Sequence, residues 1–200
     1  MIKKGILGGT FNPVHVGHLH LAQVALKVLE LDQLLFIPSY SPPHKAVTGL
    51  CPFHHRLAML EIAVAPYPEF SVSPLEAFRD GYSYTIDTLR QLAGESGEKE
   101  QLFFLMGFDA FVEMGSWKEY QRIPEYATLA VCQRDGNDIA MVAQQLFGAV
   151  ASHVQQFDVP EKLVSSSDVR MTLIESGGAD QAFLPPGVWD YIEEHALFRG

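Results

Sequence analysis

Short apolar runs alternate along this chain with longer amphipathic stretches. Strands are expected over the apolar runs, which cover residues 6–7, 34–37, 70–72, 102–106 and 129–132. Helices are expected over the stretches between them, at residues 17–29, 53–65, 84–92 and roughly 139–146. Alternating strands and helices are typical of parallel βαβ units, so the pattern predicts an α/β fold: a Rossmann-like parallel sheet with helices on both faces.

The C-terminal tail departs from this alternation. From Ser165 onward the pattern predicts a helix, a loop and a second helix, with Pro185-Pro186 at the start of the second. We interpret residues 165–200 as a helical lid attached to the rest of the chain. The 200 residues suit one domain with a sizeable core, and they contain no internal repeat or low-complexity linker, so residues 1–200 are expected to form a single domain.

Composition narrows the classes of partner. The net charge of -10, from 14 basic and 24 acidic residues, argues against a nucleic-acid partner, which would need a basic face. No apolar run is long enough to span a membrane and the N-terminus lacks a signal-peptide core, so a cytoplasmic location is expected. Cys51 and Cys132 lack metal-site or disulfide-framework spacing and are expected to be reduced and buried.

The most informative segment runs from Gly8 to His18, with the sequence GGTFNPVHVGH. It joins the first expected strand to the first expected helix, and a glycine-bearing turn before a helix N-terminus can bind phosphate. His15 and His18 can share one helical face if the helix includes His15. Their N–H groups could stabilise charge that develops on a phosphoryl group, which points to nucleotide chemistry. His20 lacks this context and is expected at the surface.

Two later segments each allow two interpretations. In the sequence SPPHK at 41–45, the prolines stiffen the loop, so Lys45 could bind phosphate, although ordinary surface turns have the same composition. In SYTIDTL at 83–89, Ser83 or Thr85 could cap a helix, or the free N–H groups of that helix could bind a ligand carboxylate. The sequence alone leaves both questions open.

Three further positions carry candidate chemistry. Asp109 follows a strand and Gly107, where it could accept hydrogen bonds from ribose hydroxyls or cap the next helix. Trp117 could stack on a flat heterocycle or pack in the core. The three serines at 165–167, with Arg170 one turn later, supply more donors than capping requires and favour an anion site.

Taken in order, these motifs resemble the nucleotidyltransferases of the HxGH superfamily, and most closely the bacterial nicotinate-nucleotide adenylyltransferase family. The resemblance covers nearly the whole chain. The first motif alone indicates only the superfamily, whereas the ordered set indicates the family. It rests on GGTFNPVHVGH at 8–18, PPHK at 42–45, SYTIDTL at 83–89, the segment 107–109 with Trp117-Lys118, and SSSDVR at 165–170, with further agreement in HRLAML at 55–60 and in 191–198.

The resemblance implies transfer of AMP from ATP to nicotinate mononucleotide, with nicotinate adenine dinucleotide and pyrophosphate as products, in NAD biosynthesis. Mg²⁺ would assist together with ATP, and no residue of the chain is assigned to hold it. The mononucleotide phosphate would attack the α-phosphorus directly, so the protein would align the substrates and stabilise charge. The implied catalytic residues are His15, His18, Lys45 and Arg170.

The resemblance also assigns binding residues. The ATP site would comprise Gly8, Gly9, Thr10, Phe11, His15, His18, Gly107, Asp109, Arg134, Ser166, Ser167 and Arg170. The nicotinate mononucleotide site would comprise His44, Lys45, Thr85 and Trp117. The chain departs from the family at three positions without losing a reacting group: Asn12 replaces a frequent aspartate, Phe108 a small residue and Ser167 a threonine.

Three alternatives compete with this hypothesis. A sister enzyme could prefer the nicotinamide mononucleotide or phosphopantetheine, but the phosphopantetheine enzymes typically have threonine at the position of His15 and a shorter chain. A non-catalytic nucleotide sensor is disfavoured because the four implied catalytic residues are intact. A transfer-RNA-binding module is disfavoured by the acidic composition. The oligomeric state and the strictness of the preference for acid over amide stay open.

Overall fold

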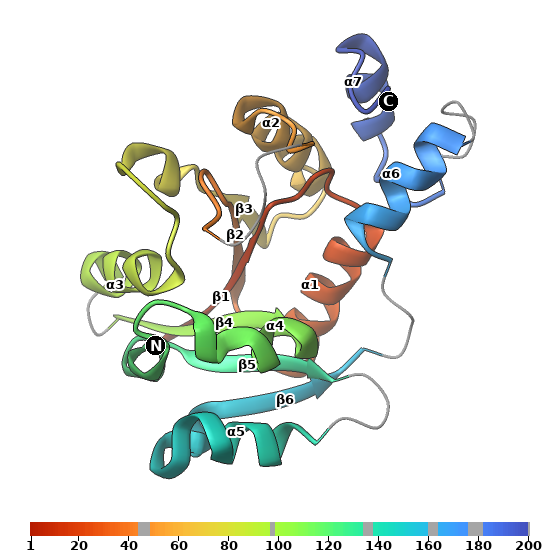
Figure 1. Ribbon diagram of the computed structural model, residues 1–200. Helices are drawn as coiled ribbons and strands as arrows, with labels where there is room; N and C mark the ends of the chain where they lie inside the picture. Colours follow the sequence, from red (N-terminus) through yellow and green to blue (C-terminus); the bar gives the residue numbers. More distant parts are fainter. Residues whose placement is uncertain (44–48, 97–98, 134–137, 160–163, 176–181, 200) are drawn as a thin grey trace.

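A single parallel sheet forms the centre of the molecule. The computed structural model describes residues 1–43, 49–96, 99–133, 138–159, 164–175 and 182–199 (Figure 1). Six strands pair side by side in the order β3-β2-β1-β4-β5-β6, and every neighbouring pair is parallel. Their bounds are β1 Ile2–Gly9, β2 Gln33–Pro38, β3 Phe70–Val72, β4 Glu100–Gly107, β5 Thr128–Gln133 and β6 Val154–Asp158.

This strand order is that of the Rossmann fold, so the predicted fold class is confirmed. The chain order reverses between β1 and β4, and ligands of such sheets bind beyond the carboxyl ends of the strands at that point. The α-helices are α1 Val16–Val28, α2 Phe53–Val64, α3 Thr85–Ser96, α4 Phe108–Glu113, α5 Ile139–Phe147, α6 Ser166–Glu175 and α7 Val188–Glu194. Shorter 3₁₀ segments are η1 Leu75–Phe78, η3 Met114–Ser116, η4 Tyr120–Glu125 and η5 Gly148–His153.

Helices cover both faces of the sheet because successive strand side chains point in opposite directions. In β4, Phe103 and Leu105 pack into one core, whereas Phe104 and Met106 pack into the other. The first core is completed by α1, α2, α6 and α7, and the second by α3, α4 and α5. Each face of the sheet therefore carries its own hydrophobic core.

The C-terminal helices belong to the first core. Val169 and Leu173 of α6 and Ile192 of α7 are buried there, and α7 lies against α2 (Figure 1). The backbone N–H of Val16 donates to the carbonyl of Phe183 at 2.9 Å, which joins the start of α1 to the tail. The tail is thus packed into the main body along much of its length.

The structure differs from the sequence analysis at three places. The strand β6 was not anticipated, because this edge strand reads VQQFD and buries only Phe157. The final helix begins at Val188 rather than at Pro185-Pro186, because Gly187 has a φ of +80° and turns the chain before the helix starts. His20 is half-buried rather than on the surface, and its Nε2 is buried without a hydrogen-bond partner among the described residues.

Membrane spanning requires that helices be both long and apolar. None of those in the described ranges has both the length and the apolar character to cross a membrane.

Candidate active site

Two cavities lie at the carboxyl edge of the sheet and share Gly9 and Thr10 as a common wall. The first, which we call the histidine cavity, measures about 620 Å³. The second, the tryptophan cavity, measures about 670 Å³. Each is within the usual size range for a small-molecule site. The histidine cavity is lined by His15, His18, Gly107, Ser166, Ser167 and Arg170, among others, and the tryptophan cavity by Gly8, Pro42, Pro43, Thr85, Trp117 and Lys118, among others.

The two histidine rings stack on each other, with centroids 3.6 Å apart and an interplanar angle of 28°. Helix α1 begins at Val16, so His15 is its N-cap in an extended conformation and not a helical residue. The N-cap and the third helical position are still neighbours, as in a capping box, where the side chain of each residue bonds the backbone of the other. The backbone N–H of His15 donates to Nδ1 of His18 at 3.2 Å, so neutral His18 carries its proton on Nε2.

His15 is only 4% exposed. Burial lowers the pKa of its imidazole to about 4, although the nearby negative charge of Asp168 opposes this shift, so the ring is neutral at pH 7. Its Nδ1 has no hydrogen-bond partner among the described residues. A β-carbon on Gly17 would lie 3.1 Å from this nitrogen and 3.2 Å from the carbonyl oxygen of Val164, so the ring packs closely over a glycine.

The shared wall is held by Arg56, whose role the sequence analysis missed. Arg56 is 1% exposed and donates from Nη1 to the Thr10 carbonyl and from Nε to the Cys51 carbonyl, both at 2.8 Å. Burial lowers the pKa of its guanidinium, and the opposite charge of Glu76 counteracts this. A sequence signal existed: Arg56 shares one face of α2 with the buried Met59 and Leu60.

The asparagine at position 12 has a structural role that an aspartate could not fill. Its Nδ2 donates to the Gly49 carbonyl, and its Oδ1 accepts from the Cys51 N–H, both at 3.0 Å. Asn12 therefore ties the loop after β1 to the segment before α2. The departure from the family's frequent aspartate is consistent with this bridging amide, because a carboxylate has no proton to donate when ionised.

The start of α6 closes the histidine cavity. Ser165 caps this helix by accepting from the N–H of Asp168 at 3.2 Å, which leaves the next serines for other contacts. Ser166 donates from Oγ to the Pro13 carbonyl at 3.1 Å. Arg170 donates from Nη1 to the Asn12 carbonyl at 2.7 Å and from Nη2 to Oγ of Ser167 at 3.2 Å. The structure thus brings the serine motif and the histidine motif together.

The tryptophan cavity combines an aromatic wall with the start of α3. Trp117 lines the cavity and also packs against Phe104, with ring centroids 6.3 Å apart, so both interpretations of this residue hold. Thr85 is the first residue of α3, where backbone N–H groups lack intrahelical acceptors. Oγ of Ser83 accepts from the N–H of Ser41 at 3.0 Å, which ties the segment before α3 to the loop after β2.

The remaining candidates divide into three groups. Phe11 is buried with a φ of +46°, and its ring packs edge-on against His18, so it supports the histidine. Asp109 lies exposed in the first turn of α4, two residues beyond Gly107. The candidates His44, Lys45 and Arg134 lie outside the described residues.

A protein-bound metal ion requires several ligating side chains close together. Within the described ranges, no group of three or more His, Cys, Asp or Glu side chains is arranged to hold a metal ion. The donors around the histidine cavity are imidazole, hydroxyl and guanidinium groups, which suit an anion rather than a bare cation. These donors therefore suit the phosphate oxygens of a ligand.

Known proteins resemble this chain over nearly its whole length. The Cytidylyltransferase-like family matches residues 6–172. A protein of Thermus thermophilus named probable nicotinate-nucleotide adenylyltransferase is 42% identical over 198 residues, which cover 99% of this chain and 100% of the relative. A protein of Citrifermentans bemidjiense with the same name is 36% identical over 214 residues, which cover 98% of each chain.

A solved structure shows the same fold. The Plasmodium falciparum nicotinic acid mononucleotide adenylyltransferase complexed with NaAD superposes with a TM-score of 0.80 at 19% identity, over 99% of this chain and 98% of that one. The full-length sequence matches are close enough to establish kinship, and they agree with the ordered motifs. The chain therefore belongs to the nicotinate-nucleotide adenylyltransferase family, within the Cytidylyltransferase-like group.

Proposed function

We propose that this protein transfers AMP from ATP to nicotinate mononucleotide, giving nicotinate adenine dinucleotide and pyrophosphate. The observation that carries the proposal is the pair of cavities that meet at Gly9 and Thr10. One cavity has paired imidazoles and a serine-rich helix start, and the other has an aromatic wall and a helix N-terminus. Because both cavities include Gly9 and Thr10 in their linings, substrates bound in them would lie next to each other, as a direct transfer requires.

In this proposal ATP occupies the histidine cavity. The Nε2–H of His18 donates to the reacting phosphate. The ring of His15 stacks on the ring of His18 and holds it in place. Arg170, Ser166 and Ser167 bind the β- and γ-phosphates, for which a guanidinium and a helix N-terminus are suited. Gly107 lines this cavity, and we expect Gly107 and Asp109 to contact the adenosine ribose.

The acceptor occupies the tryptophan cavity. Trp117 stacks on the pyridine ring, and the backbone N–H of Thr85 donates to the ring carboxylate. A phosphate oxygen of the mononucleotide attacks the α-phosphorus of ATP, one P–O bond forms, and the bond to the β-phosphate oxygen breaks to release pyrophosphate. The roles assigned to His44, Lys45 and Arg134 remain predictions from the resemblance.

Catalysis in this scheme is mainly electrostatic. The imidazole of His18, held by the stacked ring of His15, donates to the phosphoryl oxygens as charge develops on them in the transition state, and no covalent enzyme intermediate forms. A divalent cation bound with ATP, which we expect to be Mg²⁺, would neutralise part of the phosphate charge. The chain itself supplies alignment, hydrogen-bond donors and positive charge.

The test is an assay with purified protein, ATP, Mg²⁺ and either nicotinate or nicotinamide mononucleotide, with dinucleotide and pyrophosphate both measured. We expect product with both mononucleotides and a higher kcat/KM with the acid. Formation of dinucleotide mainly from the amide would identify the sister enzyme instead. Absence of product with either mononucleotide would overturn the proposal.

A further inference from the structure

The described wall of the tryptophan cavity carries more negative than positive charge, which is unfavourable for an anionic substrate. Its described lining includes two carboxylates, Glu76 and Glu113, and Lys118 is the only lysine or arginine within that described lining. Glu76 is already engaged, because it accepts from Oγ1 of Thr88 at 2.7 Å and lies 3.7 Å from the guanidinium of Arg79. A mononucleotide with a ring carboxylate would meet an acidic wall with one cation.

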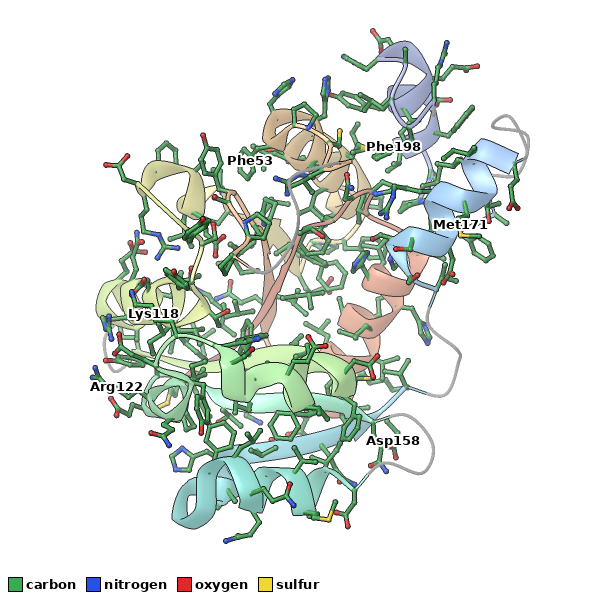
Figure 2. The ribbon with its side chains drawn as sticks, viewed as in Figure 1. Phe53, Lys118, Arg122, Asp158, Met171 and Phe198 are labelled. Carbon is green, nitrogen blue, oxygen red and sulfur yellow. The ribbon has the colours of Figure 1, made fainter. Side chains whose placement is uncertain are left out.

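Lys118 lies where the ring of the acceptor is expected. Its Nζ is 2.9 Å from Oδ2 of Asp87 and 4.7 Å from the centre of the Tyr84 ring, so the ammonium sits over the start of α3. Figure 2 shows Lys118 beside this helix. It directly follows Trp117 in the chain, so the proposed stacking residue and the cation lie on the same strip of cavity wall.

Asp87 explains why this cation matters. It lies in the first turn of α3, two residues after Thr85, where the acceptor carboxylate is expected. An uncompensated aspartate there would repel that carboxylate and cancel the attraction of the helix N-terminus. Arg90 also contacts Asp87, at 3.2 Å, but it shares its guanidinium with Glu119 at the same distance. Lys118 is the contact of Asp87 that also lines the cavity.

We propose that Lys118 determines the preference of this site for an acceptor ring that carries a carboxylate over one that carries a carboxamide. The ammonium attracts the ring carboxylate and neutralises Asp87, and a neutral carboxamide gains from neither effect. The inference rests on the proposed function, because it assumes that the acceptor ring lies in the tryptophan cavity.

The test compares kcat/KM for nicotinate and nicotinamide mononucleotide in wild type and variants. Because Lys118 is partly exposed to solvent, Lys118→Met is expected to lower the acid-to-amide ratio by about 3- to 10-fold, mainly through a higher KM for the acid. Lys118→Arg keeps the charge and should keep the ratio within about twofold. Lys27→Met, in the last turn of α1, removes the same charge far from the cavity and should leave the ratio unchanged.

A double variant distinguishes two roles of Lys118: its positive charge in the cavity and its ion pair with Asp87, which could anchor the Trp117 loop. If Lys118 acts through charge, Lys118→Met with Asp87→Asn should recover part of the acid preference, because the repelling carboxylate is gone. If it only anchors the loop through the ion pair, both substrates should slow equally and Asp87→Asn should give no recovery. That result, or an unchanged ratio in Lys118→Met, would overturn the inference. Failure of the proposed function is distinct, because wild type would then make no dinucleotide.

Discussion

His15 and His18 have different environments although their rings stack. His15 is buried and neutral, with a pKa lowered to about 4, so it shapes the site and adds no charge at neutral pH. His18 accepts a backbone N–H at Nδ1, which fixes its tautomer with the proton on Nε2. The buried ring of His15 and the backbone contact at Nδ1 together orient His18, so its Nε2–H has a fixed direction toward a bound phosphate.

Replacement of His18 by alanine tests its assigned role as the hydrogen-bond donor to the reacting phosphate. We expect turnover to fall by about 10³-fold, because a donor aimed at transition-state charge is lost, while ATP affinity changes little. Turnover and ATP binding should be measured separately, by steady-state kinetics and calorimetry. His195→Ala, at an exposed histidine at the end of α7, is the matched control and should keep full activity. Full activity in His18→Ala would contradict the assigned role.

The buried hydrogen bonds of Arg56 are expected to stabilise the folded protein. Arg56→Met would leave the carbonyls of Thr10 and Cys51 without their buried donors, at a cost of about 2–4 kcal/mol in the free energy of unfolding. Arg56→Lys keeps the charge and one donor and should lose less. Urea denaturation measures both. Arg122→Met, at an exposed arginine, should match wild type, and an equal loss there would argue against a specific role for Arg56.

At the scale of elements, the site depends on how helices end and begin. The start of α1 supplies the histidines, the start of α3 the expected carboxylate site, and the start of α6 the serines and arginine. Helix N-termini bind anions, and here three of them face the carboxyl edge of one sheet. Contacts from Ser166 and Arg170 to the loop after β1 hold α6 in this position.

The close approach of α1 to the histidine ring can be tested with Gly17→Ala. The new β-carbon would press on the His15 ring and on the Val164 carbonyl, so we expect about a tenfold loss of kcat. Gly94→Ala, in α3 with open space around it, is the matched control and should stabilise the protein by about 0.5–1 kcal/mol without loss of activity. Unchanged kcat in Gly17→Ala would show that the ring tolerates displacement.

At the scale of the whole molecule, the buried neutral histidine couples stability to pH. The pKa of His15 is about 4 in the folded protein, against 6.5 for an unperturbed imidazole, so the unfolded state binds a proton more readily. The contribution of His15 to stability is therefore fully present above pH 6.5 and declines as the pH falls toward 4. Below that range both states are protonated and the decline stops.

This coupling predicts a loss of roughly 3 kcal/mol between pH 7 and pH 4 from His15 alone. Because carboxylates titrate over the lower part of this range, the measurement is the difference between wild type and His15→Gln. Urea denaturation at several pH values should show a steeper decline for wild type. Parallel curves for the two proteins would mean that the ring is not held neutral by burial.

The sequence by itself determined the fold class and the position of its first motif at the carboxyl edge of the sheet. The strand–turn–helix that contains His15 and His18 is local, so residue order alone places it at the carboxyl edge of a parallel sheet. The helix bounds agreed within a few residues for α1 and α2. The edge strand β6 could not be predicted, because one buried residue in five gives no periodic signal.

Only the tertiary structure decided how distant segments combine. The contact of Arg56 with Thr10, that of Arg170 with Asn12 and that of Lys118 with Asp87 each join residues from different elements. Such contacts depend on the register and packing of whole helices against the sheet, which no local pattern contains. The meeting of two cavities at Gly9 and Thr10 has the same origin, because it follows from where β1 lies among its neighbours.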